Sequence, residues 1–177
     1  MKPWILSVLC VLGLHTPLAA YATAVNVAAT TDSMPLCGQG VFRFFGFSVY
    51  DAKLYGTCHG SELFNHPFTL ELTYSRSFTR KQLVDSSLDE MARLQAIPDS
   101  AVKQRWSLEM DKAFSDVVPG DTFKGEYLPG QGARFYLNGK LTSSVDDPDF
   151  ARHFFDIWFD RDTRAPGLRA QLLGEDK

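Results

Sequence analysis

Residues 122–145 read TFKGEYLPGQGARFYLNGKLTSSV, and this stretch decides the class of fold. Its short apolar runs are separated by two turn sequences, PGQG at 129–132 and NG at 138–139. Asn-Gly between apolar runs is a strong signal for a two-residue hairpin turn, whose central residues both need positive φ. Connections this short join antiparallel strands. The stretch therefore predicts an antiparallel meander with strands at 122–128, 133–137 and 141–145.

Further strands are predicted upstream of this meander. The segments 41–47 and 48–55 are rich in Phe, Tyr and Val and predict two strands, or one strand bent at Gly46. The segment 68–74 alternates apolar and polar residues, which is typical of a half-buried strand. A turn at 65–67 precedes it, because Asn-His-Pro combines turn-forming residues.

Helical spacing separates these two groups of strands. Thr79 and Gln82 have the spacing of a capping box, and apolar residues then recur at helical intervals. Pro98-Asp99-Ser100 ends this helix and starts a second one. Asp147-Pro148 predicts the start of a third, with an N-cap followed by a first-turn proline, and a short fourth covers 168–173. The segregated order predicts an α+β fold, an open antiparallel sheet with helices packed on one face.

The amino terminus has the order of a secretory signal peptide. Lys2 gives a positive start, an apolar run ends at Leu14, and small residues follow around Ala22 and Ala24. We predict a signal peptide over 1–24, cleaved after Ala22 or Ala24, a flexible lead-in over 25–36, and a single domain over 37–177. The apolar run is shorter than the roughly 20 residues of a membrane span, so no integral membrane segment is expected after cleavage. The chain would then be exported.

Composition limits the partners. The chain has 177 residues, 45% of them hydrophobic, and a formal net charge of −3. This length and composition suit one globular domain. A nucleic-acid partner is not expected, because nucleic-acid-binding domains are usually basic and carry clustered charge. The net charge also gives no electrostatic attraction to an anionic membrane.

Two cysteines remain after signal cleavage, Cys37 and Cys58. In an exported chain such a pair is a candidate for one disulfide, which here would join the two ends of an aromatic segment. Two cysteines are too few for a zinc site of the usual kind, so no metal is expected.

Catalytic signatures are missing from the sequence. There is no H-E-x-x-H, no nucleophile elbow and no P-loop, and no cofactor is expected. Gly38-Gln39-Gly40 lacks the third glycine of a dinucleotide fingerprint and is interpreted as a strand entry or bulge. The acidic cluster Asp146, Asp147 and Asp149 lacks the later glutamate of a calcium loop and is interpreted as a helix cap.

The aromatic segment 42–47 has two interpretations. It can be core packing on a sheet, or the wall of an apolar ligand pocket with a few convergent polar groups. Arg43, Tyr50, Tyr74 and Arg76 lie on or beside the predicted strands and are the candidates for those groups. An arginine facing the pocket would bind a carboxylate, whereas the alternative for Arg43 is a solvated strand face.

An ordered set of motifs runs from Cys37 to Gly174. No single motif is specific, but the ordered set resembles the bacterial chalcone isomerase-like proteins. The motifs are Gly38-x-Gly40, Phe45-Gly46-Phe47-Ser48-Val49-Tyr50-Asp51-Ala52-x-Leu54-Tyr55, Leu70-Glu71-Leu72-x-Tyr74, Gly120-Asp121, Tyr127-x-Pro129-Gly130-x-Gly132, Phe135-Tyr136-x-Asn138-Gly139, Phe154-Phe155-x-Ile157-Trp158 and Leu168-Arg169-x-x-Leu172-Leu173-Gly174.

This resemblance implies an open antiparallel sheet covered by helices, with a ligand cleft between sheet and helices. Plant members of the family close a flavanone ring, and related members only bind fatty acids. The resemblance places the enzymes' substrate-clamping arginine at Phe42, or at best at the neighbouring Arg43, which would point to the opposite face of the strand. It places their water-orienting threonine at Phe45. Phenylalanine offers no means of polarising a ketone, so no catalytic residue is carried over.

We therefore expect an exported domain that binds a small apolar or amphipathic molecule, fatty-acid-like or aromatic, without converting it. The family resemblance implies that its compartment is the bacterial periplasm. One alternative is an isomerase of the intramolecular lyase type with a rearranged pocket. Another is a ligand-free protein-interaction module whose phenylalanines fill the cleft. The sequence names no protein partner. A ligand pocket usually measures about 300–1,000 Å³. The binding protein and the isomerase both require a cavity of this size, whereas the protein-interaction module would have its cleft filled by side chains.

Overall fold

The computed structural model describes residues 34–175 except 59, 95, 96 and 98. The predicted signal peptide and most of the predicted lead-in lie outside the described residues. Six strands form one antiparallel sheet whose order follows the chain. They are β1 (Leu36–Phe44), β2 (Phe47–Gly56), β3 (Phe68–Tyr74), β4 (Thr122–Leu128), β5 (Gly132–Leu137) and β6 (Lys140–Val145).

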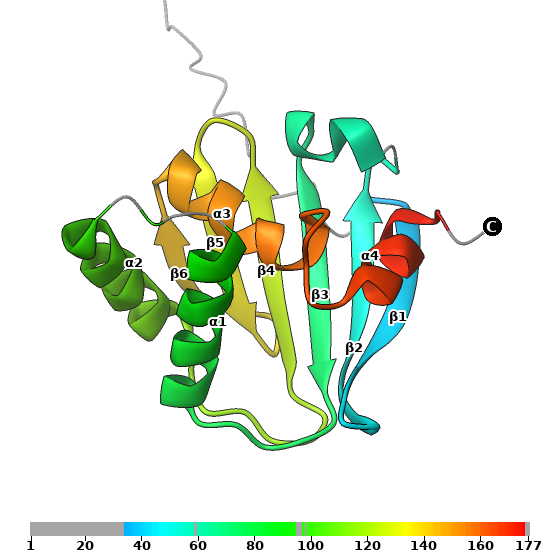
Figure 1. The fold of residues 1–177 in the computed structure, drawn as a ribbon, viewed down its shortest axis with the longest axis horizontal. Helices are drawn as coiled ribbons and strands as arrows, with labels where there is room; N and C mark the ends of the chain where they lie inside the picture. Colours follow the sequence, from blue (N-terminus) through cyan, green and yellow to red (C-terminus); the bar gives the residue numbers. More distant parts are fainter. Residues whose placement is uncertain (1–33, 59, 95–96, 98, 176–177) are drawn as a thin grey trace, which may run out of the picture.

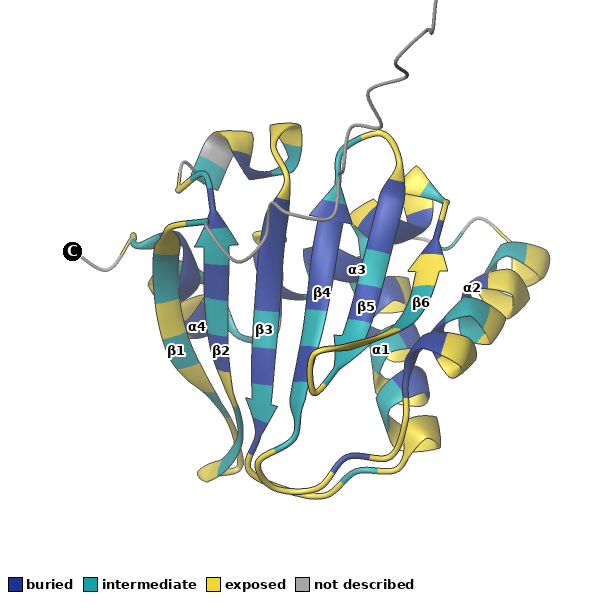
Figure 2. Cartoon of the chain, turned by 180° about the vertical axis from the view of Figure 1, so that it is seen from behind, coloured by how far each residue is buried: buried dark blue, intermediate teal, exposed yellow. Residues whose placement is uncertain are grey.

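Helices lie on one face of this sheet (Figure 1), and the view from behind shows the opposite face without helices (Figure 2). Two helices connect β3 to β4, and two follow β6. The predicted α+β class with helices on one face is thus confirmed. The helices are α1 (Arg80–Leu94), α2 (Ser100–Ala113), α3 (Pro148–Phe159) and α4 (Pro166–Leu173). None of these described helices is long and apolar enough to cross a membrane.

The helix ends follow the predicted caps. The Thr79 backbone N–H donates to Gln82 Oε1 at 2.9 Å, and the Gln82 N–H donates back to Thr79 Oγ1 at 3.3 Å, which completes the capping box of α1. Asp99 and Asp147 accept backbone N–H groups at the starts of α2 and α3. Gly174 ends α4 in the left-handed conformation.

Two hairpins of the sheet use the same tight turn. Asn138 and Gly139 have φ of 50° and 79°, and Phe45 and Gly46 have φ of 48° and 81°. Positive φ at both central residues is the type I′ geometry that suits the twist of a hairpin. The segment 41–55 is therefore two strands, one of the two predicted arrangements.

The 3-10 helix η2 (Gly60–Asn65) was not predicted; it precedes the predicted turn. Its six residues carry too short a pattern to distinguish a helix from a loop. In the second half of the sheet, the limits of β4, β5 and β6 differ from the predicted ones by one residue at most.

Aromatic rings fill the space between sheet and helices. Phe155 of α3 packs edge-on against Phe68 of β3, with ring centroids 4.9 Å apart. Gly125 of β4 allows this approach, because a Cβ at that position would lie 3.0 Å from the Phe155 ring. The largest fully buried aromatic side chains are Trp106, Phe68, Phe135, Phe150, Phe154 and Phe155.

The edge strand β1 is fixed in two ways. Gly38 and Gly40 lie under α4: a Cβ on Gly38 would overlap the carbonyl oxygens of Gln171 and Leu172. The Gly-x-Gly motif is thus a close-packing device within a strand, with a register irregularity between Leu36 and Gly38. The predicted disulfide between Cys37 and Cys58 joins the start of β1 to the chain just after β2.

Candidate functional site

Two tyrosines lie side by side on the helix-covered face of the sheet. Tyr50 of β2 and Tyr74 of β3 are direct register partners, and their rings meet edge-on at 5.9 Å. The ring of Phe42 stacks on Tyr50 at 5.1 Å, and Phe78 lies 6.0 Å from Tyr74. Together with Trp158 of α3, these residues form what we call the tyrosine site.

The tyrosine site holds hydroxyl groups with unused hydrogen-bonding capacity. The indole N–H of Trp158 donates to Tyr50 Oη at 2.9 Å. Among the described residues, neither Tyr50 nor Tyr74 donates a hydrogen bond from its own hydroxyl. Burial raises the pKa of both phenols well above the usual value, so both stay protonated at any physiological pH. The site therefore offers O–H donors in an environment of low dielectric constant.

The tyrosine site includes residues at the edge of the core. Phe42, Tyr50 and Phe78 pack against the buried core but are themselves only partly buried. Leu83 of α1 and Ile157 of α3 are partly buried in the same way. Apolar side chains at the edge of the core are the kind of surface against which an apolar ligand would rest.

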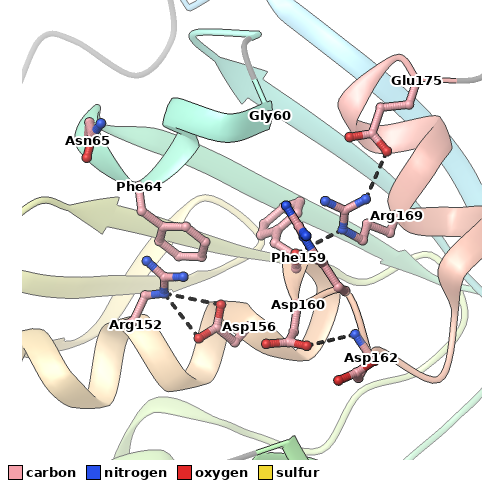
Figure 3. A pocket seen from close by; sticks show the side chains of 11 residues that line it. Gly60, Phe64, Asn65, Arg152, Asp156, Phe159, Asp160, Asp162, Arg169 and Glu175 are labelled. Carbon is pink, nitrogen blue, oxygen red and sulfur yellow. Dashed lines mark hydrogen bonds and ion pairs between the residues drawn. The ribbon is translucent and has the colours of Figure 1, made fainter.

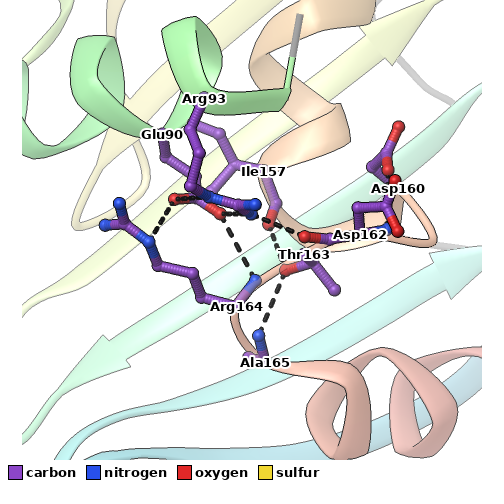
Figure 4. Close-up of polar contacts among 8 residues, drawn as sticks. All are labelled: Glu90, Arg93, Ile157, Asp160, Asp162, Thr163, Arg164 and Ala165. Carbon is purple, nitrogen blue, oxygen red and sulfur yellow. Dashed lines mark hydrogen bonds and ion pairs between the residues drawn. The ribbon is translucent and has the colours of Figure 1, made fainter.

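A buried carboxylate, that of Glu90, lies between α1 and the chain that follows α3 (Figure 4). Glu90 of α1 accepts from Arg93 Nη2 at 2.6 Å and pairs with Arg164 Nε at 3.0 Å, and it also accepts the Arg164 backbone N–H. Arg93 donates further to the carbonyl oxygen of Asp162 at 2.6 Å. These contacts, which we call the Glu90 clamp, tie α1 to the connection between α3 and α4.

The pKa of Glu90 is set by opposing effects. Burial acts to raise it, but the hydrogen bonds and charges of Arg93 and Arg164 outweigh burial and hold the pKa of Glu90 below its usual value. A carboxyl whose pKa is lower in the folded state stabilises the fold above its unfolded pKa. That stabilisation is lost as the pH falls through the folded pKa.

We predict that Glu90→Gln lowers the free energy of unfolding by about 1–3 kcal/mol at pH 7, because charge-assisted hydrogen bonds to a buried group are lost. The difference from wild type should shrink as the pH falls below 4, where the wild-type carboxylate also takes up a proton. Urea denaturation across this pH range measures it. The control is Asp85→Asn, which removes an exposed pair with Lys81 and should change little. A difference in the free energy of unfolding that stays the same from pH 7 to below pH 4 would contradict this account.

Arg43 and Arg76, the two predicted arginines, lie apart from the tyrosines. Arg43 is exposed near the end of β1, opposite Ser48, while its neighbour Phe42 stacks on Tyr50. Arg76 is exposed as well, and its guanidinium lies 5.0 Å from the centroid of the Phe47 ring. The structure thus brings Tyr50 and Tyr74 together. Both arginines are exposed to solvent, and for Arg43 a solvated strand face was the alternative to a place in the pocket.

A hollow of about 590 Å³ lies away from the tyrosine site, between η2, α3 and α4 (Figure 3). Two of its three arginines are paired within the protein: Arg152 pairs with Asp156 and lies over the Phe64 ring, and Arg169 pairs with Glu175. We call it the polar pocket. Its size suits a ligand, but its lining is charged rather than apolar. Among its charged residues the acids are Asp156, Asp160, Asp162 and Glu175, against Arg152, Arg161 and Arg169.

The polar pocket was not predicted from the sequence. Arg152 and Asp156 lie four residues apart on a helix, and this spacing predicts an ion pair between them. It does not predict that a pocket lies beside the pair. An excess of acidic over basic residues gives the pocket no attraction for a carboxylate. Among the described residues, no group of three or more His, Cys, Asp or Glu is arranged to hold a metal ion.

Comparisons with known proteins agree with this architecture. A family model described as chalcone isomerase-like matches residues 17–174. Among solved structures, a fatty-acid binding protein of Arabidopsis thaliana superposes with a TM-score of 0.62 at 16% sequence identity, over 81% of this chain and 88% of that chain. At this identity the likeness is one of fold. No curated protein matches the chain.

Proposed function

Because this chain belongs to the chalcone isomerase-like family, we propose that it binds a small amphipathic molecule at the tyrosine site without converting it. The ligand would have an apolar part, an acyl chain or an aromatic ring, and an oxygen acceptor at one end. The observation that carries the proposal is the pair of neighbouring tyrosine hydroxyls with unused donors beside Trp158. The fold shared with a fatty-acid binding protein supports an acyl ligand.

The chemistry of the tyrosine site fits this proposal. A carboxylate or carbonyl oxygen could accept hydrogen bonds from Tyr50 and Tyr74, and bonds to an ionised acceptor are the stronger kind. The apolar part of the ligand would lie against the partly buried side chains of Phe42 and Phe78.

The titration of the nearby groups favours binding over catalysis. A general base works best with a pKa near the operating pH. The pKa values of Tyr50 and Tyr74 are raised by burial, and that of Glu90 is lowered by its arginines. Neither kind of group is therefore suited to exchange a proton with a ligand near neutral pH. Phe42 and Phe45, at the positions where the resemblance places catalytic groups, supply none.

We also propose that the chain works in an oxidising compartment outside the cytoplasm, the periplasm if the host is a bacterium. The disulfide between Cys37 and Cys58 supports this, because disulfides persist mainly in oxidising compartments. The predicted signal peptide is the second support.

Titration calorimetry with palmitate tests the ligand proposal. Wild type should bind palmitate, and the double variant Tyr50→Phe/Tyr74→Phe should bind it more weakly by about 100-fold or more, since two hydrogen bonds to a charged group are lost and each is worth about 1.5 kcal/mol or more. The matched control is Tyr136→Phe, whose hydroxyl bonds to Glu126 on the opposite face of the sheet. It should bind palmitate like wild type.

Two results would contradict the proposal. One is equal palmitate affinity for wild type and the double variant, and the other is no binding of palmitate or of an aromatic probe such as naringenin. Cyclisation of naringenin chalcone, followed by its absorbance, would favour the isomerase alternative. The absence of any small-molecule binding would favour the protein-interaction alternative.

A further inference from the structure

The tip of the β1–β2 hairpin exposes an unusual amount of aromatic surface. Phe44, Phe45 and Phe47 have exposed fractions of 60%, 86% and 62%. They occupy one tight turn at an end of the sheet (Figure 1). Single exposed apolar residues are ordinary, but a contiguous group of large ones marks an interaction site. We call Arg43–Phe47 together with Arg76 the aromatic tip.

Phe45 also adopts an unfavourable backbone conformation. Its φ of 48° is one that a bulky side chain rarely takes, and Asn, Asp or Gly is usual at this position of a type I′ turn. The other such turn of this chain has Asn138 there, with φ of 50°. Phe45 gains almost no burial in return for this strain. A residue that is both strained and exposed does not stabilise the fold, which suggests that its side chain has another function.

The charges of the aromatic tip are positive. Arg43 lies beside the turn, and Arg76 lies over the ring of Phe47. Neither forms an ion pair within the part of the chain that the structure describes. The chain as a whole has a net charge of −3, so this local excess of positive charge runs against the overall balance.

We propose that the aromatic tip docks the protein on the surface of an anionic lipid bilayer. The three phenylalanines would enter the interface, and Arg43 and Arg76 would meet the anionic headgroups. Apolar side chains beside basic ones are the usual composition of surfaces that lie in this interface. A protein partner fits less well, because stable protein interfaces bury about 800 Å² on each side and a hairpin tip is small and convex. This inference does not depend on the proposed ligand.

Vesicle flotation tests the proposal with lipid alone. Wild type should float with vesicles of phosphatidylglycerol and phosphatidylcholine in a 3:7 ratio, and less with phosphatidylcholine alone. Phe45→Asn should reduce the bound fraction about tenfold, because burial of one phenylalanine is lost. Its thermal stability should be equal to wild type or higher, since Asn suits the turn. Arg43→Gln/Arg76→Gln should reduce binding to the anionic vesicles and leave the weaker binding to phosphatidylcholine unchanged.

The matched control is Leu108→Asn, which removes an exposed apolar side chain from α2. It should float like wild type. Failure of wild type to bind anionic vesicles would overturn the proposal, and so would a Phe45→Asn variant that binds them as well as wild type. Concentration-dependent dimers that Phe45→Asn abolishes, without vesicle binding, would assign the tip to a second copy of the chain instead.

Discussion

Truncation of Phe155 to alanine is expected to lower the free energy of unfolding by about 3–5 kcal/mol. Phe155 is fully buried, and its ring meets those of Phe68 at 4.9 Å, Phe154 at 5.3 Å and Tyr127 at 5.8 Å. These neighbours belong to β3, β4 and α3, so the cavity would open where helix and sheet meet. Close packing limits how far the surrounding rings can relax into it.

Guanidinium denaturation followed by circular dichroism measures this loss. Phe44→Ala is the control, since the same truncation at an exposed position should change the free energy of unfolding by about 0.5 kcal/mol or less. A loss below about 1 kcal/mol for Phe155→Ala would show that the aromatic core can repack, and that the fit of α3 on the sheet is looser than the structure indicates.

Removal of the disulfide is expected to lower the free energy of unfolding by about 3 kcal/mol. Cys37 and Cys58 are 21 positions apart, so the bond restricts a substantial loop in the unfolded chain. In the folded chain it fixes the start of β1, an edge strand whose one strand partner is β2. The double variant Cys37→Ser/Cys58→Ser should therefore unfold at lower denaturant concentration than the oxidised wild type.

The matched control is the wild-type protein under reducing conditions, which should approach the stability of the double variant. Thiol titration of the oxidised, unfolded protein should find no free thiol at Cys37 or Cys58. Equal midpoints for the oxidised protein and the double variant would contradict the expected contribution of the bond.

Local chemistry made much of the fold predictable. The Asn138-Gly139 turn, the Thr79 capping box and the Asp147 cap each depend on neighbouring residues alone, and each is present as predicted. The period-two pattern of Phe68–Tyr74 also gave the correct strand, because its alternate side chains face the core.

The site was less predictable because it depends on which side chains meet across elements. Alternation along β1 separates Phe42, which stacks on Tyr50, from the exposed Arg43. The two interpretations of the aromatic segment 42–47 both proved incomplete: Phe42 packs against the core, whereas Phe45 is almost fully exposed. Arg93 lies three residues from Glu90 on the same helix, but the other partner, Arg164, lies 74 residues further along the chain. A local sequence pattern therefore does not predict the whole clamp.

The Glu90 clamp has a consequence for the thermodynamics of binding. By joining α1 to the connection between α3 and α4, it fixes the helices near the tyrosine site relative to each other. The conformational entropy of ordering these helices is then lost during folding, before any ligand arrives. A ligand that enters a preorganised site loses less of its interaction free energy to the ordering of the protein. The same carboxylate that stabilises the fold would therefore also strengthen binding, without contacting the ligand.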